Sequence, residues 1–155
     1  MYQKILVPLD GSELAECVLP HVESIAKGCG VKNIVFLRVA EPFQAPAGEA
    51  RSIFTEEEVK RIDSENKATA ESYLDQLVKR AKSDGVNIQT EMISGRVADS
   101  ITEYAIKNEV DLIIIATHGR SGISRWVWGS VADRLLRSSC VPVLMVRAPG
   151  CVAGI

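Results

Sequence analysis

The sequence Asp111-Leu112-Ile113-Ile114-Ile115 runs directly into Ala116-Thr117-His118-Gly119-Arg120-Ser121-Gly122-Ile123-Ser124-Arg125-Trp126-Val127-Trp128-Gly129-Ser130. The first run is short, uninterrupted and β-branched, which predicts a strand covered on both faces of a parallel sheet. After the glycine-rich run, Val131, Leu135 and Leu136 recur at helical spacing and predict a helix. A loop of about a dozen residues between a buried strand and a helix is longer than packing requires, and such loops are often functional.

The start of this helix is suited to an anion. Ser130 and Asp133 have the spacing of an N-cap and an N3 residue, so the first free backbone N–H groups point back toward the loop. A phosphate there gains those donors and the positive end of the helix dipole. Gly119 and Gly129 lack a Cβ and would let the backbone come close to it. A glycine-rich connector with an ordinary cap is the alternative interpretation.

Outward from this stretch, strands alternate with helices. Apolar runs predict strands at 4–9, 33–40, 86–93, 111–115 and 143–147. Pro20 is expected to kink the first helix or to divide it, and Thr55 with Glu58 forms a capping box that opens a long one. This alternation predicts a single parallel α/β sheet with right-handed crossovers. We expect one domain over residues 1–147 and a flexible tail over 148–155.

Composition limits the class of protein. The chain has 155 residues, 46% of them hydrophobic and 25% charged, with a formal net charge of −2. It has no basic block, so nucleic acid is not an expected partner. Its 4 cysteines form no CxxC pair, and no apolar run is long enough to cross a membrane. These features favour a reduced, cytoplasmic protein without membrane contact.

Three other nucleotide or phosphate-binding folds fit poorly. No Gly-Lys-Ser/Thr of a Walker loop occurs, and Asp10-Gly11-Ser12 after the first strand offers one glycine rather than GxGxxG. A receiver domain would need a phosphoacceptor aspartate at the end of the third strand, which instead reads Glu91-Met92-Ile93-Ser94.

Gly119, nine residues and then Gly129-Ser130 resemble the nucleotide-binding signature of the universal stress protein family, Gly-x2-Gly-x9-Gly-Ser/Thr. The neighbouring Thr117 to Gly122 and the later Val141-Pro142-Val143-Leu144 are also similar to that family, and the resemblance extends from Ile5 to Val146. Ala116 stands where the signature has its first glycine. A methyl group there would crowd a ribose.

The resemblance implies an open five-stranded sheet of order 3-2-1-4-5 with helices on both faces, a Rossmann-like fold of the adenine nucleotide alpha hydrolase type. It places a crevice between the first and fourth strands, where ligands of open α/β sheets bind. Asp10 would accept hydrogen bonds from ribose or help to hold Mg²⁺, its alternative role being to cap the first helix. The implied nucleotide-binding residues are Pro8, Leu9, Asp10, Val39, Ala116, His118, Gly119, Arg120, Gly129, Ser130 and Val131.

We therefore expect a protein of this family that binds ATP, or AMP or ADP, with Mg²⁺, and acts as a nucleotide-gated binding or signalling module in a stress response. No catalytic residue is assigned, because His118 has no partner at a recognisable spacing. The alternatives are a slow ATPase or self-phosphorylating protein, and a structural dimer that has lost the nucleotide. The last strand, Val143 to Arg147, is apolar and at the sheet edge in the implied order, which predicts a homodimer through this strand.

Overall fold

The computed structural model describes residues 2–42, 55–81, 85–117 and 130–147. Its five strands form one parallel sheet in the order β3-β2-β1-β4-β5, as expected. The strands are β1 (Lys4–Pro8), β2 (Asn33–Ala40), β3 (Asn87–Ser94), β4 (Leu112–Ala116) and β5 (Val143–Val146). The helices are α1 (Glu13–Glu16), α2 (Leu19–Cys29), α3 (Glu56–Arg80), α4 (Val97–Lys107) and α5 (Ser130–Ser138).

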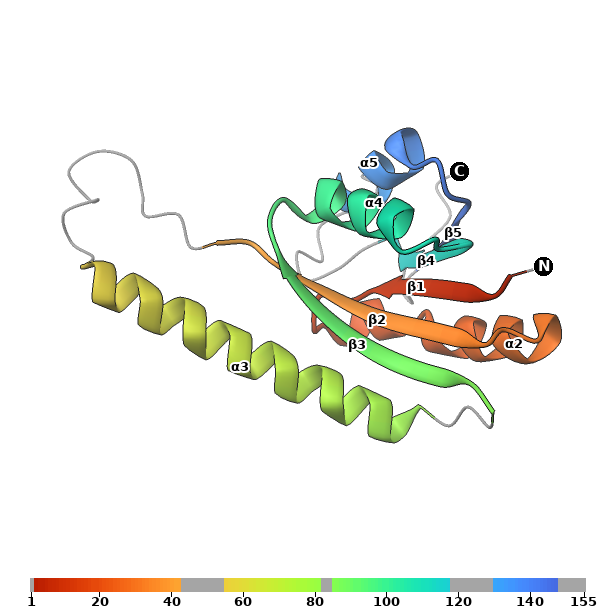
Figure 1. Cartoon of the computed structure of the whole chain (residues 1–155), viewed down its shortest axis with the longest axis horizontal. Coiled ribbons are helices and arrows are strands. Elements are labelled where there is room, and N and C mark those ends of the chain that lie inside the picture. Colours follow the sequence, from red (N-terminus) through yellow and green to blue (C-terminus); the bar gives the residue numbers. More distant parts are fainter. Residues whose placement is uncertain (1, 43–54, 82–84, 118–129, 148–155) are drawn as a thin grey trace, which may run out of the picture.

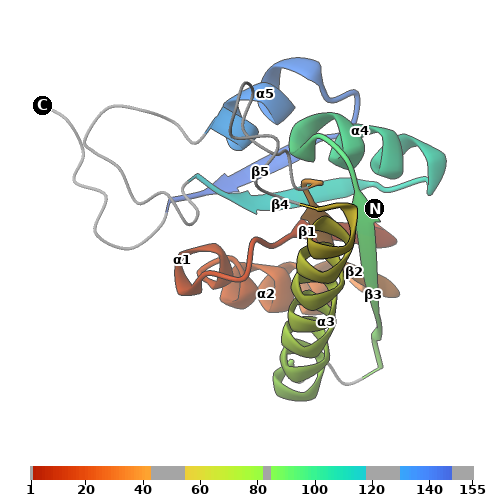
Figure 2. The same ribbon diagram turned by 90° about the vertical axis from the view of Figure 1, so that its left-hand side faces the viewer.

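Helices cover both faces of the sheet. In Figures 1 and 2, α1, α2 and α3 lie on one side, and α4 and α5 lie on the other. The buried residues divide in the same way, because Phe36 of β2 packs in the cluster with α2 and α3 while Leu37 packs in the cluster with α4 and α5. The central strands are therefore apolar along their length: every residue of β4 is buried, and in β1 only Lys4 is not.

The β1–β4 seam of the sheet opens toward its carboxyl end. β1 pairs with β2 from Lys4↔Asn33 to Pro8↔Leu37, but in the described strands it pairs with β4 only at Ile5↔Leu112 and Leu6↔Ile113. The backbone of Lys4 faces β4, since its carbonyl accepts from the Asp111 N–H at 3.0 Å. Alternate residues face the same neighbour, so Pro8 also faces β4 and has no N–H to donate. Because Pro8 cannot donate a hydrogen bond to β4, the two strands separate at the switch point of the sheet.

The first helical segment is divided, as Pro20 predicts. α1 ends at Glu16 and α2 begins at Leu19, so Pro20 lies in the first turn of α2, where a missing N–H costs no helical hydrogen bond. α2 ends at Gly30 in the left-handed conformation (φ 65°). The helix is thus two pieces rather than a kinked rod.

The other boundaries follow the predictions to within one residue. β2 matches its predicted range, and Thr55 caps α3 in a full capping box with Glu58. β1 and β5 each end one residue earlier than predicted, and β3 lies one residue further along. α5 begins at Ser130, so this residue is the first of the helix and not its N-cap as predicted. Shifts of this size are usual where helices and strands fray.

α3 is longer than the strands that it covers. It has 25 residues, about 37 Å at 1.5 Å per residue, whereas the 8 residues of β2 span about 26 Å. Its buried residues are Ala70, Leu74 and Leu77, all in its second half. The first half extends past the carboxyl end of the sheet (Figure 1).

Candidate functional site

A cavity of about 700 Å³ lies at the carboxyl ends of the strands, where the β1–β4 seam opens. This size is within the range of small-molecule sites, and the position is the switch point at which open α/β sheets bind ligands. Residues of both helical layers line it. They are Pro8, Leu9, Asp10, Gly11, Ala15, Leu37, Arg38, Val39, Ala40, Glu41, Asn66, Thr69, Ala70, Tyr73, Val97, Ile101, Ile115, Ala116, Thr117, Ser130, Val131 and Ala132.

The cavity brings together the predicted site residues that the structure describes. These are Pro8, Leu9, Asp10, Val39, Ala116, Ser130 and Val131. His118, Gly119, Arg120 and Gly129 lie outside the described residues. Residues 8–10, 39, 116 and 130–131 come from four separate parts of the chain, so the meeting of their side chains is a property of the strand order.

Asp10 organises the turn that follows β1. Its Oδ1 accepts hydrogen bonds from the Ser12 backbone N–H at 2.9 Å and from the Ser12 hydroxyl at 2.6 Å. Ser12 in turn caps α1, its Oγ accepting from the Ala15 N–H at 3.2 Å. The alternative in which Asp10 itself caps the helix is therefore wrong, and the carboxylate borders the cavity.

Arg38 packs against the same turn. Gly11 has φ 83°, and a Cβ placed on it would lie 3.0 Å from Nη1 of Arg38. Glycine is needed here both for the positive φ and for the close approach of the guanidinium. Sequence reasoning missed Arg38 because it occupies an interior position of a predicted apolar strand.

The side of the cavity under α4 and α5 is apolar. Leu37 and Ile115 come from the strands, Val97 and Ile101 from the first turns of α4, and Ala132 from α5. Val97 and Ile101 were not among the predicted site residues. Valine and isoleucine are ordinary core residues, so the sequence carries no signal that these two positions line a cavity. An aromatic base or another flat apolar group suits this wall.

The start of α5 gives the cavity an end that is suited to an anion. Ser130 and Val131 are its first two residues, and both border the cavity. The first backbone N–H groups of a helix have no partner within it, and the dipole places partial positive charge there. This end of the cavity is suited to an anion such as a phosphate.

The side under α1 and α3 is polar. The Tyr73 hydroxyl oxygen is buried near the negative charge of Glu16. Burial raises the pKa of Tyr73, and the negative charges of Glu16 and Asp10 raise it further. Arg80, near the end of α3, donates to Glu16 at 3.0 and 3.1 Å. Tyr73 therefore stays neutral at physiological pH.

Two residues at the end of β4, Ala116 and Thr117, line the cavity. Ala116, in the first glycine position of the signature, is 7% exposed, and its methyl group lines the cavity. Thr117 is a buried polar residue whose backbone N–H donates to the Val146 carbonyl at 2.8 Å. β5 thus holds the point from which the glycine-rich segment departs.

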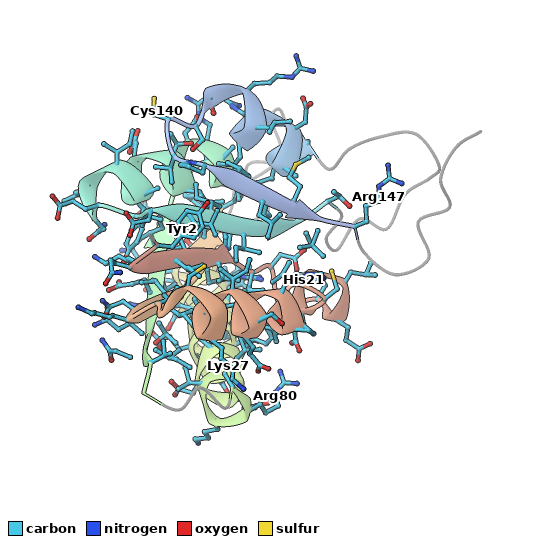
Figure 3. All side chains as sticks on the ribbon, turned by 90° about the vertical axis from the view of Figure 1, so that its right-hand side faces the viewer. Tyr2, His21, Lys27, Arg80, Cys140 and Arg147 are labelled. Atoms are coloured by element: carbon cyan, nitrogen blue, oxygen red, sulfur yellow. The ribbon has the colours of Figure 1, made fainter. Side chains whose placement is uncertain are left out.

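No group of three or more His, Cys, Asp or Glu side chains in the described residues is arranged to hold a metal ion. Mg²⁺ usually keeps several waters and binds through one or two carboxylates and the phosphates of a substrate. Asp10 fits that limited role. His21 is exposed on α2 (Figure 3) and is not among the residues that line the cavity. None of the described helices is long and apolar enough to cross a membrane.

These observations define a parallel α/β protein with a ligand cavity at the switch point of its sheet. The chain belongs to the universal stress protein family, since the model of that family matches residues 1–147. Universal stress protein MJ0531 of Methanocaldococcus jannaschii is similar in sequence: 33% identical over 150 residues, covering 96% of this chain and 84% of the relative.

Solved structures show the same fold. That of hypothetical protein MJ0577 is 27% identical, covers 97% of this chain and 99% of that one, and has a TM-score of 0.83. A universal stress protein in complex with cAMP is 23% identical, with a TM-score of 0.68, covering 95% of this chain and 98% of its own. Nucleotide binding therefore occurs on this fold.

Proposed function

We propose that this chain binds an adenine nucleotide, ATP with Mg²⁺ above AMP or ADP, and works as a nucleotide-gated binding or signalling module in the cytoplasm during a stress response. One observation carries the proposal. Three kinds of lining meet in one cavity: an apolar wall, a carboxylate at Asp10 and the start of α5. A nucleotide carries a base, a ribose and a phosphate, and each of these groups suits one of the three linings.

The roles follow from this arrangement. Pro8, Leu9 and Val39 would flank adenine, and Asp10 would contact ribose or Mg²⁺. Ser130 and Val131 would contact phosphate through the helix start. His118, Gly119, Arg120 and Gly129 are proposed to complete the phosphate site from the glycine-rich segment.

Calorimetry and thermal unfolding with ATP and Mg²⁺ test the proposal. A ligand at a hundredfold excess over Kd stabilises the folded state by roughly 2.7 kcal/mol, which for this size of protein raises Tm by roughly 5 to 10 °C. Absence of any shift with ATP, ADP, AMP and cAMP would show that the cavity does not take adenine nucleotides. Rapid release of ADP would instead favour the ATPase.

Ala116 supports a second candidate, a dimer that has lost the nucleotide, because its methyl group occupies cavity wall. Ala116→Gly distinguishes the two. If the methyl group closes the site, the variant gains ATP binding that the natural chain lacks. If the natural chain binds ATP, the variant changes affinity only modestly.

We also propose a homodimer through the edge strand β5, with Val143 to Arg147 of two chains side by side. β5 is at the sheet edge and is made of Val143, Leu144, Met145 and Val146. Figure 3 shows Arg147 at its end, pointing outward. Unpaired apolar edges are normally covered. Light scattering that gives a monomer mass at micromolar concentration would refute this assembly.

A further inference from the structure

The cavity extends onto both faces of the sheet. Ile101, Ile115 and Ala132 belong to the hydrophobic cluster under α4 and α5. Ala15 belongs to the opposite cluster, under α1, α2 and α3, Tyr73 packs against that cluster, and both residues line the same cavity. A ligand at the switch point therefore meets a second helical layer. None of the residues expected from the sequence comes from α3.

α3 presents one regular face to the cavity. Asn66, Thr69, Ala70 and Tyr73 follow the spacing at which helical residues lie on one side. Ala70 and Tyr73 pack toward the sheet, whereas Asn66 and Thr69 are exposed. Asn66 lies in the first half of α3 and Thr69 just past its midpoint, and both side chains line the cavity rather than the core.

Asn66 and Thr69 supply neutral hydrogen-bonding groups. The Thr69 hydroxyl donates to the Glu65 carbonyl at 2.9 Å, which leaves its oxygen as an acceptor. The Asn66 amide carries two donors and an acceptor. Within the described residues this amide makes no hydrogen bond or ion pair. Both side chains are therefore available to a ligand.

The charges on this side of the cavity are of both signs. Arg38 and Asp10 line it together, and Glu16 is paired with Arg80 at 3.0 Å. The Tyr73 hydroxyl remains protonated. This side therefore favours a neutral, hydroxyl-bearing group over an anion or an apolar ring. Of the three parts of a nucleotide, the sugar has that chemistry.

We propose that Asn66 and Thr69 hydrogen-bond the ribose hydroxyls and make the site selective for ribonucleotides over deoxyribonucleotides. The inference rests on the proposed function and names the part of that site which reads the sugar. It assigns α3 a role in specificity: Asp10 contacts the sugar from the β1 side, and α3 contacts it from the other side.

Calorimetry with ATP, 2′-deoxy-ATP and 3′-deoxy-ATP tests this on the full chain. One neutral hydrogen bond corresponds to about a threefold to tenfold change in affinity, so the natural chain should bind ATP that much more tightly than one of the deoxy forms. Asn66→Ala or Thr69→Val should weaken ATP toward the value of that deoxy form and leave the deoxy form unchanged. Ser72→Ala, an exposed change on the same helix outside the cavity lining, is the matched control.

The possible outcomes distinguish the sugar contact of α3 from the proposed nucleotide binding on which it rests. Equal binding of ATP and both deoxy forms by the natural chain overturns the role of α3 and leaves nucleotide binding intact. The same holds if Asn66→Ala and Thr69→Val leave the preference for ATP unchanged. Failure to bind any nucleotide overturns the proposed function and the sugar contact with it. Asn66 and Thr69 are exposed, so their variants are expected to fold.

Discussion

The α4 and α5 side of the sheet and the α1 and α3 side meet the same cavity with different side chains. Under α4 and α5 the lining is Leu37, Val97, Ile101 and Ile115, with no titratable group among them. Under α1 and α3 it includes Asp10, Arg38, Asn66 and Tyr73. The difference shows that one layer of this fold lines the cavity with core side chains, while the other adds polar and charged side chains to core residues such as Ala15.

Removal of a core side chain that also lines the cavity should have the largest effect. Ile101 is 0% exposed, so Ile101→Ala should destabilise the fold by about 2 to 5 kcal/mol and lower Tm by roughly 5 to 15 °C. It should also reduce the rise in Tm given by ATP, because the apolar wall is lost. Thermal unfolding with and without ATP measures both.

Leu77→Ala on the other face is the matched control. Leu77 is 1% exposed and lies in the opposite hydrophobic cluster, outside the cavity lining. A similar fall in Tm with the ATP-induced rise intact is expected. Equal loss of that rise in both variants would mean that general destabilisation, rather than the apolar wall, weakens binding.

An acidic residue at the start of α5 should have an intermediate effect. Val131→Glu places a carboxylate where phosphate is proposed, and should weaken ATP at least tenfold, about 1.4 kcal/mol. Val131 is half-buried against the hydrophobic cluster under α4 and α5, so we also expect some loss of stability, partly offset because the first turn of a helix favours acidic residues. Leu136→Glu, at a position 51% exposed on the same helix, is the control for calorimetry. Unchanged ATP affinity in Val131→Glu would place the phosphate elsewhere.

The smallest effect concerns two partly buried tyrosines, one on each side of the sheet. Burial raises the pKa of Tyr73 and of Tyr104, more strongly for Tyr73. A raised pKa favours the neutral form in the folded state, so its contribution to stability is complete below the unfolded pKa of about 10 and is lost as pH rises above it. Tyr73→Phe should remove more of this alkaline loss than Tyr104→Phe. Tm measured from about pH 8 to about pH 11, a range that spans the ordinary tyrosine pKa, compares the two variants. The same dependence of Tm on pH in both variants would contradict the difference in burial.

Much of the fold followed from local patterns. The apolar run of β2 predicted its range to the residue, Thr55 and Glu58 predicted the start of α3, and Pro20 predicted a kink or a division in the first helix, of which the structure has the division. Each rests on contacts within a few residues, which a sequence displays directly. The strand order came instead from family resemblance, because periodicity does not show which strands are neighbours.

The site was predicted in part. The resemblance indicated Asp10 and Val39, but Asn66 and Thr69 were not among the predicted site residues. Helical periodicity shows which face is apolar. It does not show that the sheet ends before the helix does, which is why exposed residues of α3 border a cavity. Arg38 was missed for a related reason, since its strand is apolar on both sides of it.

Pro8 also bears on cooperativity. Because β1 and β4 pair at only two positions in the described strands, the strands β1 to β3 and the strands β4 and β5 are two blocks joined by few backbone hydrogen bonds, while both hydrophobic clusters pack across the seam. Blocks joined by few hydrogen bonds can open separately as local unfolding units. A ligand held by residues of both would join them, so we expect nucleotide to slow amide hydrogen exchange in β4 as well as in β1. Slowing confined to one block would show that the ligand does not span the seam that Pro8 opens.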